Sequence, residues 1–244
     1  MLRYGLIGYP LGHSFSPAFF EAKFRKWGLA ARYDAYPLPD LTALPALVAD
    51  QKLQGLNVTI PYKEAVLPYV QHMDPHAAAI GAVNCIRVEP DGALTGFNTD
   101  WIGFGKSLSD WLQPLPTGAL ILGAGGASKA VAYALAQLGI PFRKAARKTG
   151  AGDLSFSGIS AHILADFPLL INTTPLGTWP EADAKPPFDY SLLTPQNMLY
   201  DLVYNPEETA FMQEGLRRGC RVKNGLEMLQ IQAEESWKIW QATA

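Results

Sequence analysis

The sequence is poor in charge, and this shortage excludes several classes of protein. Charged residues make up 17% of the 244 residues, against about 25% in an average globular domain. The hydrophobic content of 48% excludes an extended disordered chain, which needs high charge and few apolar groups. The 20 Lys and Arg residues do not outnumber the 22 Asp and Glu residues, so we expect no nucleic-acid partner and no anionic membrane partner.

Cysteines and long apolar runs are also scarce. The two cysteines, Cys85 and Cys220, form no disulfide framework and no zinc motif, and they favour a reducing compartment. No apolar run reaches the roughly 18 residues of a membrane span, and Pro10 comes too early for a secretory signal. The four histidines lack metal-binding spacing. We therefore expect a cytoplasmic protein with no metal site.

Strand and helix patterns alternate along the chain, which is typical of an α/β fold with a parallel sheet. The apolar patterns predict strands at 2–7, 32–36, 55–60, 83–88, 93–96, 119–122, 142–146, 169–172, 198–203 and near 222. Helices are predicted from an N-cap at Ser16 to Gly28, at 101–112, at 129–138, from an N-cap at Asn205 to about 218, and at 227–240. The proline-rich connection 113–118 is the expected boundary between two domains.

A glycine loop follows the apolar strand at 119–122. Gly123, Gly125 and the small residue Ser128 match the pattern G-x-G-x-x-small, and an alanine-rich helix follows them. Backbone N–H groups at such a helix start attract a pyrophosphate. The alternative is a tight turn in some other α/β protein.

The residues beyond the glycine loop indicate which dinucleotide it binds. An NAD site carries an acid roughly 20 residues further on, which binds the ribose hydroxyl. Here that stretch contains Arg143, Lys144, Arg147 and Lys148, and no acid occurs before Asp153. Cationic groups attract the 2′-phosphate of NADP, so NADP is favoured over NAD. The alternative is an ordinary solvated basic surface.

Polar residues recur in the first 100 positions. Asn57 and Thr59 share one face of a predicted strand, Lys63 follows it, and Asn84 and Asp100 come later. Each also has an ordinary explanation. Asn57 and Thr59 could line the solvent-exposed face of an edge strand, Lys63 could be a surface lysine, and Asp100 could be a helix N-cap. Together they supply an amide, a hydroxyl, an ammonium and a carboxylate, which suit a polyhydroxylated ligand.

These motifs and others, in order along the chain, resemble the shikimate dehydrogenase family. The matching segments are 8–10 with 13–17, 57–63, 81–84, 98–100, 123–128, 172–177, 200–206, and 224–229 with Gln232. They extend from one end of the chain to the other, and in this order they are highly specific.

The resemblance implies a fold, an activity and a cofactor. Residues 1–102, completed by 226–244, would form an α/β substrate domain, and 103–225 would form a Rossmann-like NADP domain, with the active site between them. The family catalyses the reversible NADPH-dependent reduction of 3-dehydroshikimate to shikimate, in the biosynthesis of chorismate and aromatic amino acids. A monomer or homodimer with a small-molecule substrate is expected.

The resemblance also assigns roles to residues. Lys63 and Asp100 would be the catalytic pair: Lys63 would donate a proton to the carbonyl oxygen, and Asp100 would orient it. The residues expected to bind substrate are Ser14 and Ser16, at the carboxylate, and Thr59, Asn84, Asp100 and Gln232, at the ring hydroxyls, with Asn57 behind them. The residues expected to bind cofactor are Gly123, Gly125, Gly126, Ala127, Arg147, Lys148, Thr173, Thr174, Pro175, Leu202, Tyr204 and Gly225.

The sequence departs from the family at two points and leaves two alternatives open. Phe20-Glu21 replaces a common His-Asn, and Ala146-Arg147-Lys148 replaces Asn-Arg-Thr. The chain is also short around 145–164, where we expect a trimmed helix. One alternative is a quinate or quinate/shikimate dehydrogenase using NAD or NADP, although Ser14 favours shikimate. The other is a non-catalytic module that senses NADP or a ligand.

Overall fold

The computed structural model describes residues 1–12, 14–147, 150 and 152–242. The chain forms two compact units, Met1–Thr99 with Ala233–Ala244, and Asp100–Gln232, and each contains a six-stranded sheet. The segment 113–118, where we expected a domain boundary, lies within the second unit. The α/β fold class with one parallel, Rossmann-like sheet is confirmed.

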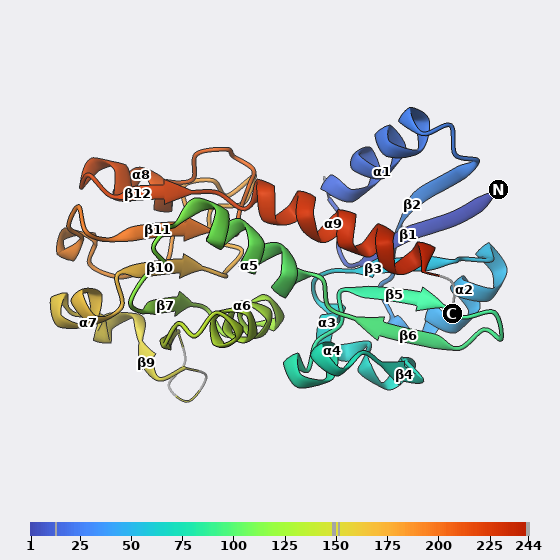
Figure 1. The fold of residues 1–244 in the computed structure, drawn as a ribbon, viewed down its shortest axis with the longest axis horizontal. Helices are drawn as coiled ribbons and strands as arrows, with labels where there is room; N and C mark the ends of the chain where they lie inside the picture. Colours follow the sequence, from blue (N-terminus) through green and yellow to red (C-terminus); the bar gives the residue numbers. More distant parts are fainter. Residues whose placement is uncertain (13, 148–149, 151, 243–244) are drawn as a thin grey trace. The chain divides into compact units, whose positions relative to one another are not determined.

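The sheet of the first unit is mixed and has the order β2-β1-β3-β5-β6-β4 (Figure 1). Its strands are β1 (Leu2–Gly8), β2 (Ala31–Pro37), β3 (Gly55–Val58), β4 (His72–Met73), β5 (Cys85–Val88) and β6 (Leu94–Phe97). β1 is parallel to β2 and β3, whereas β5 is antiparallel to both β3 and β6. The carboxyl ends of β1, β3 and β6 therefore meet at one edge of the sheet.

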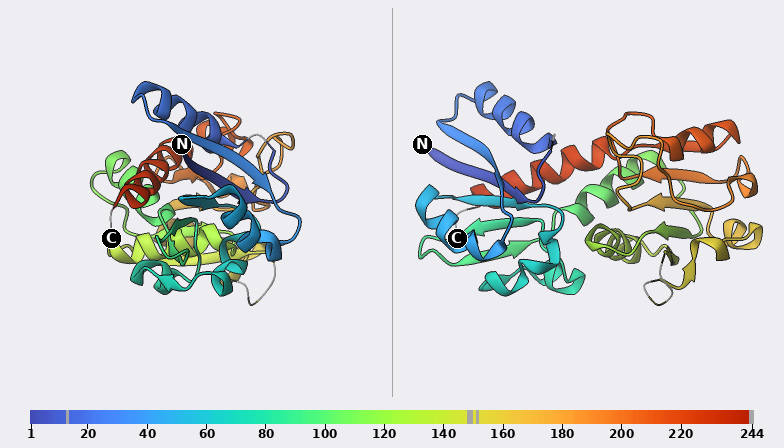
Figure 2. Two further views of the ribbon diagram at one scale, coloured as in Figure 1. Left: turned by 90° about the vertical axis from the view of Figure 1, so that its right-hand side faces the viewer. Right: turned by 180° about the vertical axis from the view of Figure 1, so that it is seen from behind.

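Helices cover the first sheet, and the largest of them begins earlier than its sequence suggests. These elements are α1 (Phe15–Lys26), η1 (Leu41–Ala43), α2 (Leu44–Gln51), α3 (Tyr62–Ala65), η2 (Leu67–Tyr69) and α4 (Pro75–Ile80). α1, which lies alongside β2 (Figure 2), has its N-cap at Ser14, so the prediction of Ser16 was wrong. Pro17 is tolerated inside the first turn because the N–H that it lacks would have no intrahelical partner there.

The end of the chain completes the core of the first unit. Helix α9 (Leu226–Gln241) brings Trp240 against Tyr4, with ring centroids 4.9 Å apart. The Trp240 indole donates to the Ile86 carbonyl at 2.9 Å. Gly55 faces this indole so closely that a Cβ there would collide with it. From Ala233 onward, the last helix is therefore an integral part of the first unit, although its sequence lies far from the strands.

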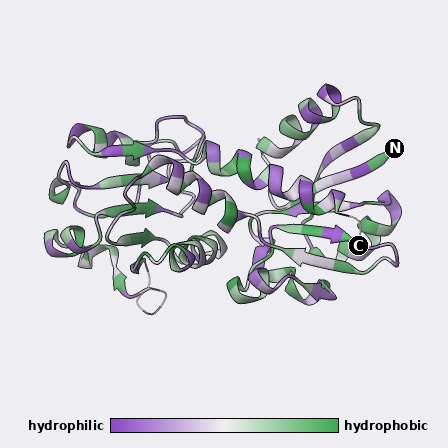
Figure 3. Cartoon of the chain, viewed as in Figure 1, coloured by the Kyte–Doolittle hydropathy of each residue, from purple (hydrophilic) through white to green (hydrophobic). Residues whose placement is uncertain are grey.

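The sheet of the second unit is entirely parallel and has the order β12-β11-β10-β7-β8-β9. Its strands are β7 (Ala119–Leu122), β8 (Phe142–Ala146), β9 (Leu154–Ser155), β10 (Leu169–Asn172), β11 (Met198–Asp201) and β12 (Arg221–Lys223). Numbered within the unit, this is the 3-2-1-4-5-6 order of a Rossmann fold. β7 and β10 are buried along their length and appear mainly hydrophobic in Figure 3, as strands covered on both faces must be.

The helices of the second unit include the short one that we expected. The elements are α5 (Asp100–Trp111), α6 (Gly126–Gln137), η3 (Phe156–Gly158), α7 (Ala161–Asp166), η4 (Tyr190–Leu192), α8 (Ala210–Arg217) and the start of α9. α8 has its N-cap at Thr209, so the predicted cap at Asn205 was wrong. The Thr209 hydroxyl accepts from Met212 N and donates to buried Asp201, which fixes the cap there. No helix of the described residues is long and apolar enough to cross a bilayer.

Candidate active site

The first sheet gathers the predicted polar residues at one edge. Residue pairing places Asn57 opposite Cys85, and Cys85 opposite Phe97. Thr59 therefore follows β3 at the same edge where Asn84 precedes β5. β1 and β3 form a topological switch point, since the chain crosses from β1 to β2 on one side and returns to β3 on the other. Ligands of α/β sheets bind at such points.

Asn57 is held in the middle of this edge by three hydrogen bonds. Tyr33 donates to Asn57 Oδ1 at 2.9 Å, and Asn57 Nδ2 donates to Ser236 Oγ at 2.9 Å and to the Asn84 carbonyl at 3.3 Å. β3 lies between β1 and β5, so the alternative explanation of a wet edge strand is wrong. The Asn57 amide lies behind the edge and ties α9 to the strands of the first unit.

Asn84 and Thr99 form a second buried pair. Thr99 N donates to Asn84 Oδ1 at 2.6 Å, and Asn84 Nδ2 donates to Thr99 Oγ1 at 3.0 Å. The Thr99 and Ser236 hydroxyls are 3.2 Å apart, although 137 residues separate them in sequence. Neither residue was predicted from the sequence. Thr99 lay inside the matched segment 98–100, whereas no local pattern points to Ser236.

Lys63 is anchored through its backbone. It lies in the four-residue helix α3, and its carbonyl accepts from Val83 N at 2.7 Å. Tyr62 N donates to the Thr59 carbonyl at 2.8 Å, which turns the chain from β3 into this helix. Thr59 and Lys63 are both half-buried. These backbone hydrogen bonds fix the position of the Lys63 main chain, from which the side chain extends.

The two serines of the predicted carboxylate site lie at the start of α1. Ser14 is the half-buried N-cap and Ser16 is buried in the first turn. Burial raises the pKa of the Tyr33 phenol well above its usual value, and a hydrogen bond with Ser16 opposes this shift. Ser16 is therefore linked through Tyr33 to Asn57. His13, which belongs to the same motif, lies outside the described residues.

Asp100 and Gln232 lie on neighbouring helices of the second unit. Both side chains are buried. On the next turn after Asp100, a Cβ at Gly103 would lie 2.6 Å from the Met228 carbonyl and 3.2 Å from Gln232 Cβ. Glycine thus allows α5 and α9 to approach closely here, and Gln232 Nε2 donates to the Leu229 carbonyl at 2.9 Å.

The glycine loop lies at the switch point of the parallel sheet. The chain leaves β7 for β8 on one side and later returns to β10 on the other. Gly123 has φ +128°, and a Cβ there would lie 2.5 Å from Thr173 Oγ1. Gly125 is the exposed N-cap of α6, and open space surrounds the position of its missing Cβ. A phosphate can approach this helix start, where backbone N–H groups and the helix dipole favour an anion, so the loop fits a pyrophosphate.

An exposed cation lies at the end of β8. Exposed Arg147 follows β8 directly, next to β7 in the sheet. Asp153, the first acid after the loop, accepts from Lys144 N at 2.7 Å, so it serves to join β8 to the following segment. Arg147 fits the 2′-phosphate of NADP. Lys148 lies outside the described residues.

The remaining cofactor candidates lie on loops that follow the neighbouring strands. Thr174 donates from N and from Oγ1 to Asn172 Oδ1, at 3.0 and 2.6 Å. Gly225 packs against the backbone of Leu202, and Gly225 N donates to the Val203 carbonyl at 3.2 Å. The two other candidates on these loops are exposed Pro175 and half-buried Tyr204.

A Rossmann-order sheet with a glycine loop at its switch point, together with a second α/β unit that carries a polar sheet edge, defines a two-domain dinucleotide-dependent oxidoreductase. Within the described residues, no cluster of His, Cys, Asp and Glu could hold a metal ion. The family model for the shikimate dehydrogenase substrate binding domain matches residues 6–86.

Full-length relatives identify the family. A shikimate dehydrogenase (NADP(+)) of Moorella thermoacetica is 41% identical over 96% of this chain and 86% of its own length. The crystal structure of Thermus thermophilus shikimate 5-dehydrogenase with NADP(H) and shikimate has a TM-score of 0.86 and 34% identity, over 99% of this chain and 94% of that one. Quinate dehydrogenase from Corynebacterium glutamicum, in complex with NAD, has a TM-score of 0.88 and 30% identity, over 98% and 93%. The chain belongs to the shikimate dehydrogenase family, so the resemblance is confirmed.

Proposed function

We propose that this protein catalyses the reversible, NADPH-dependent reduction of 3-dehydroshikimate to shikimate. The observation that carries the proposal is that one chain, similar along its whole length to shikimate dehydrogenases, has a polar edge on one sheet and a glycine loop at the switch point of the other. The residues of the first edge suit a cyclic polyol, and the loop suits a pyrophosphate. The first unit, together with Asp100 and the last helix, would bind substrate, and the rest of the second unit would bind cofactor.

Substrate recognition falls to groups that match the ligand's chemistry. Ser14 and Ser16 would donate hydroxyl hydrogen bonds to the carboxylate. The ring hydroxyls would bind Thr59, Asn84, Asp100 and Gln232. Asn57 would support these residues without contacting the substrate, because its amide already forms hydrogen bonds with Tyr33, Ser236 and Asn84.

The proton step belongs to Lys63. NADPH supplies the hydride that converts the carbonyl carbon into a C–H centre. Negative charge then develops on the oxygen, and a positioned donor must neutralise it. The Lys63 ammonium gives a proton to this oxygen, so that an N–H bond breaks and an O–H bond forms. Asp100 would orient Lys63 and accept from a neighbouring substrate hydroxyl.

NADP would be held by three kinds of group. Gly125, Gly126 and Ala127 would present backbone N–H groups to the pyrophosphate, and Arg147 would pair with the 2′-phosphate. The loops carrying Thr173–Pro175 and Leu202–Tyr204, with Gly225, would line the nicotinamide side. The positive charge of Arg147 would attract the 2′-phosphate, which NADH lacks. The protein should therefore bind NADPH more tightly than NADH.

The test is turnover with four pairs of reactants. Purified protein is mixed with shikimate or quinate, each with NADP or NAD, while the absorbance of reduced nicotinamide is followed. We expect turnover with shikimate and NADP. Turnover confined to quinate would instead favour the activity named for the Corynebacterium neighbour, and binding without turnover would indicate a non-catalytic module. Sedimentation of the same sample checks the expected monomer or homodimer.

A further inference from the structure

The last residues of β10 and β11 form a polar pair in the interior of the second unit. Asn172 and Asp201 are register partners and are both 0% exposed. Asn172 Nδ2 donates to Asp201 Oδ1 at 2.9 Å. Burying polar groups is costly unless each is hydrogen-bonded, and neither side chain is exposed to solvent. The pair therefore needs a reason other than direct ligand contact.

Asn172 organises the loop that follows its own strand. Its Oδ1 accepts from Thr174 N at 3.0 Å and from Thr174 Oγ1 at 2.6 Å, and its Nδ2 donates to the Leu176 carbonyl at 3.3 Å. Leu176 N in turn donates to Thr174 Oγ1 at 3.3 Å. One amide thus sets the conformation of the segment that contains the cofactor candidates Thr173–Pro175.

Asp201 does the same for the next loop. Its Oδ1 accepts from Val203 N at 3.0 Å, and its Oδ2 accepts from Thr209 Oγ1 at 2.6 Å. The Val203 carbonyl accepts from Gly225 N at 3.2 Å. The conformation of the segment 202–204, and the approach of Gly225 to it, therefore follow from one carboxylate.

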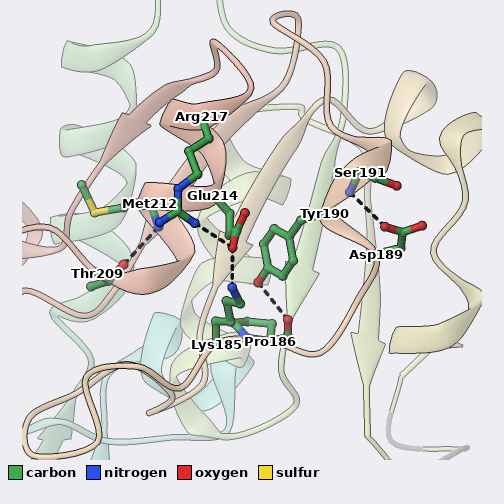
Figure 4. A network of polar contacts seen from close by, with 9 residues as sticks. All are labelled: Lys185, Pro186, Asp189, Tyr190, Ser191, Thr209, Met212, Glu214 and Arg217. Carbon is green, nitrogen blue, oxygen red and sulfur yellow. Dashed lines mark hydrogen bonds and ion pairs between the residues drawn. The ribbon is translucent and has the colours of Figure 1, made fainter.

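The network continues to the glycine loop on one side and to α8 on the other. Gly123 packs closely against Thr173 Oγ1, so the position of the loop after β10 constrains the position of the glycine loop. On the other side, α8 is clamped to the segment 185–190 by Glu214, which pairs with Lys185 and with Arg217 (Figure 4). Thr209, at the start of this helix, therefore holds Asp201 in place through its hydroxyl hydrogen bond.

We propose that Asn172 and Asp201 are positioning residues for the dinucleotide: through their mutual hydrogen bond they set the loops after β10 and β11 in the geometry that binds NADPH. This inference rests on the proposed function, since it takes NADPH as the ligand. Of the four cofactor-facing segments, those around 173–175 and 202–204 are bonded to the pair directly. Those around 123–127 and 225 are held by contact with these two loops.

The test compares removal of the Asp201 carboxylate with its conservative replacement. Asp201→Ala deletes the acceptor of three hydrogen bonds. Asp201→Asn keeps an acceptor for Asn172 and Val203, and its NH₂ can donate to the Thr209 hydroxyl, so it preserves the network. The dissociation constant for NADPH is measured by nicotinamide fluorescence well below the melting temperature. We expect Asp201→Ala to weaken NADPH binding about tenfold and Asp201→Asn to stay near wild type, with the KM for 3-dehydroshikimate changed little in both.

Two further variants keep the outcome decisive. If Asp201→Ala does not fold, Asn172→Ser carries the test, because its hydroxyl is too short to bridge Thr174 and Asp201; it should also weaken NADPH binding. Asp189→Asn is the matched control, since it removes an exposed carboxylate that caps η4 in the same unit. Folded Asp201→Ala and Asn172→Ser proteins that bind NADPH as tightly as wild type overturn the inference alone, whereas a wild type that does not bind NADPH overturns the proposed function as well.

Discussion

The buried carboxylate of Asp201 gives a stability prediction of defined sign and size. Burial raises its pKa to about 6, because desolvation outweighs the three hydrogen bonds that lower it. In the unfolded chain the pKa of an aspartate is about 3.9. A difference of about two pH units corresponds to about 3 kcal/mol. The neutral form fits the site, because its O–H can donate to the Thr209 hydroxyl.

The sign follows from which state binds the proton. Between about pH 4 and pH 6 the folded protein holds a proton on Asp201 that the unfolded chain has released. Stability from this group is therefore fully present below pH 4 and is lost as the pH rises through 6. Asp201→Asn imitates the protonated carboxyl at every pH, so it should match wild type near pH 4 and exceed it by about 3 kcal/mol near pH 7.

The assay is urea unfolding of both proteins, without nucleotide, at several pH values from 4 to 7.5. Taking the difference between the two free energies of unfolding removes the titration of all the other groups. Asp189→Asn again serves as a control, because hydrogen bonds from Ser191 lower the pKa of Asp189. Its wild-type carboxylate gains stability as the pH rises, which is the opposite slope. A wild-type-minus-Asp201→Asn difference that stays level or increases with pH would refute the reasoning.

Three other predictions concern the proposed site. Lys63→Ala should lower kcat by about 10²- to 10⁴-fold with an unchanged unfolding curve, and near-normal kcat would remove the lysine from the proton step. Gly123→Ala should destabilise the fold by about 1–3 kcal/mol, because its Cβ would meet Thr173. Gly125→Ala should leave stability unchanged, because open space surrounds that position. Both substitutions should weaken NADPH binding. If the two variants were equally stable, the steric argument for Gly123 would be contradicted. Arg147→Ala should raise the Kd for NADPH about tenfold or more and leave that for NADH unchanged, whereas equal effects on both would show that Arg147 does not read the 2′-phosphate.

Much of the second unit was predictable because its signals are local. The apolar run at 119–122 gave a strand buried on both faces, and the glycines after it gave the tight turn into α6. The Rossmann strand order itself was not visible in any segment. It depends on which strands pair, and pairing is decided by contacts between residues far apart in the sequence.

Competition between caps shows where local rules stop. Ser14 and Ser16 both suit an N-cap, as do Asn205 and Thr209, and in each case the sequence analysis chose the wrong member. Thr209 is the cap because its hydroxyl also donates to the carboxylate of Asp201. A capping residue is recognised from its neighbours in sequence, but the choice between two candidates depends on partners elsewhere in the fold.

The chain's own order of residues determined the family, the α/β class and the glycine loop, and it predicts a preference for NADP, because each depends on residue types at fixed short spacings. The tertiary structure alone decided that Ser236, from the last helix, bonds to Asn57 and lies beside Thr99, and that Asn172 and Asp201 are buried together. Burial and long-range hydrogen bonds arise only when distant segments meet, and no pattern within one segment records them.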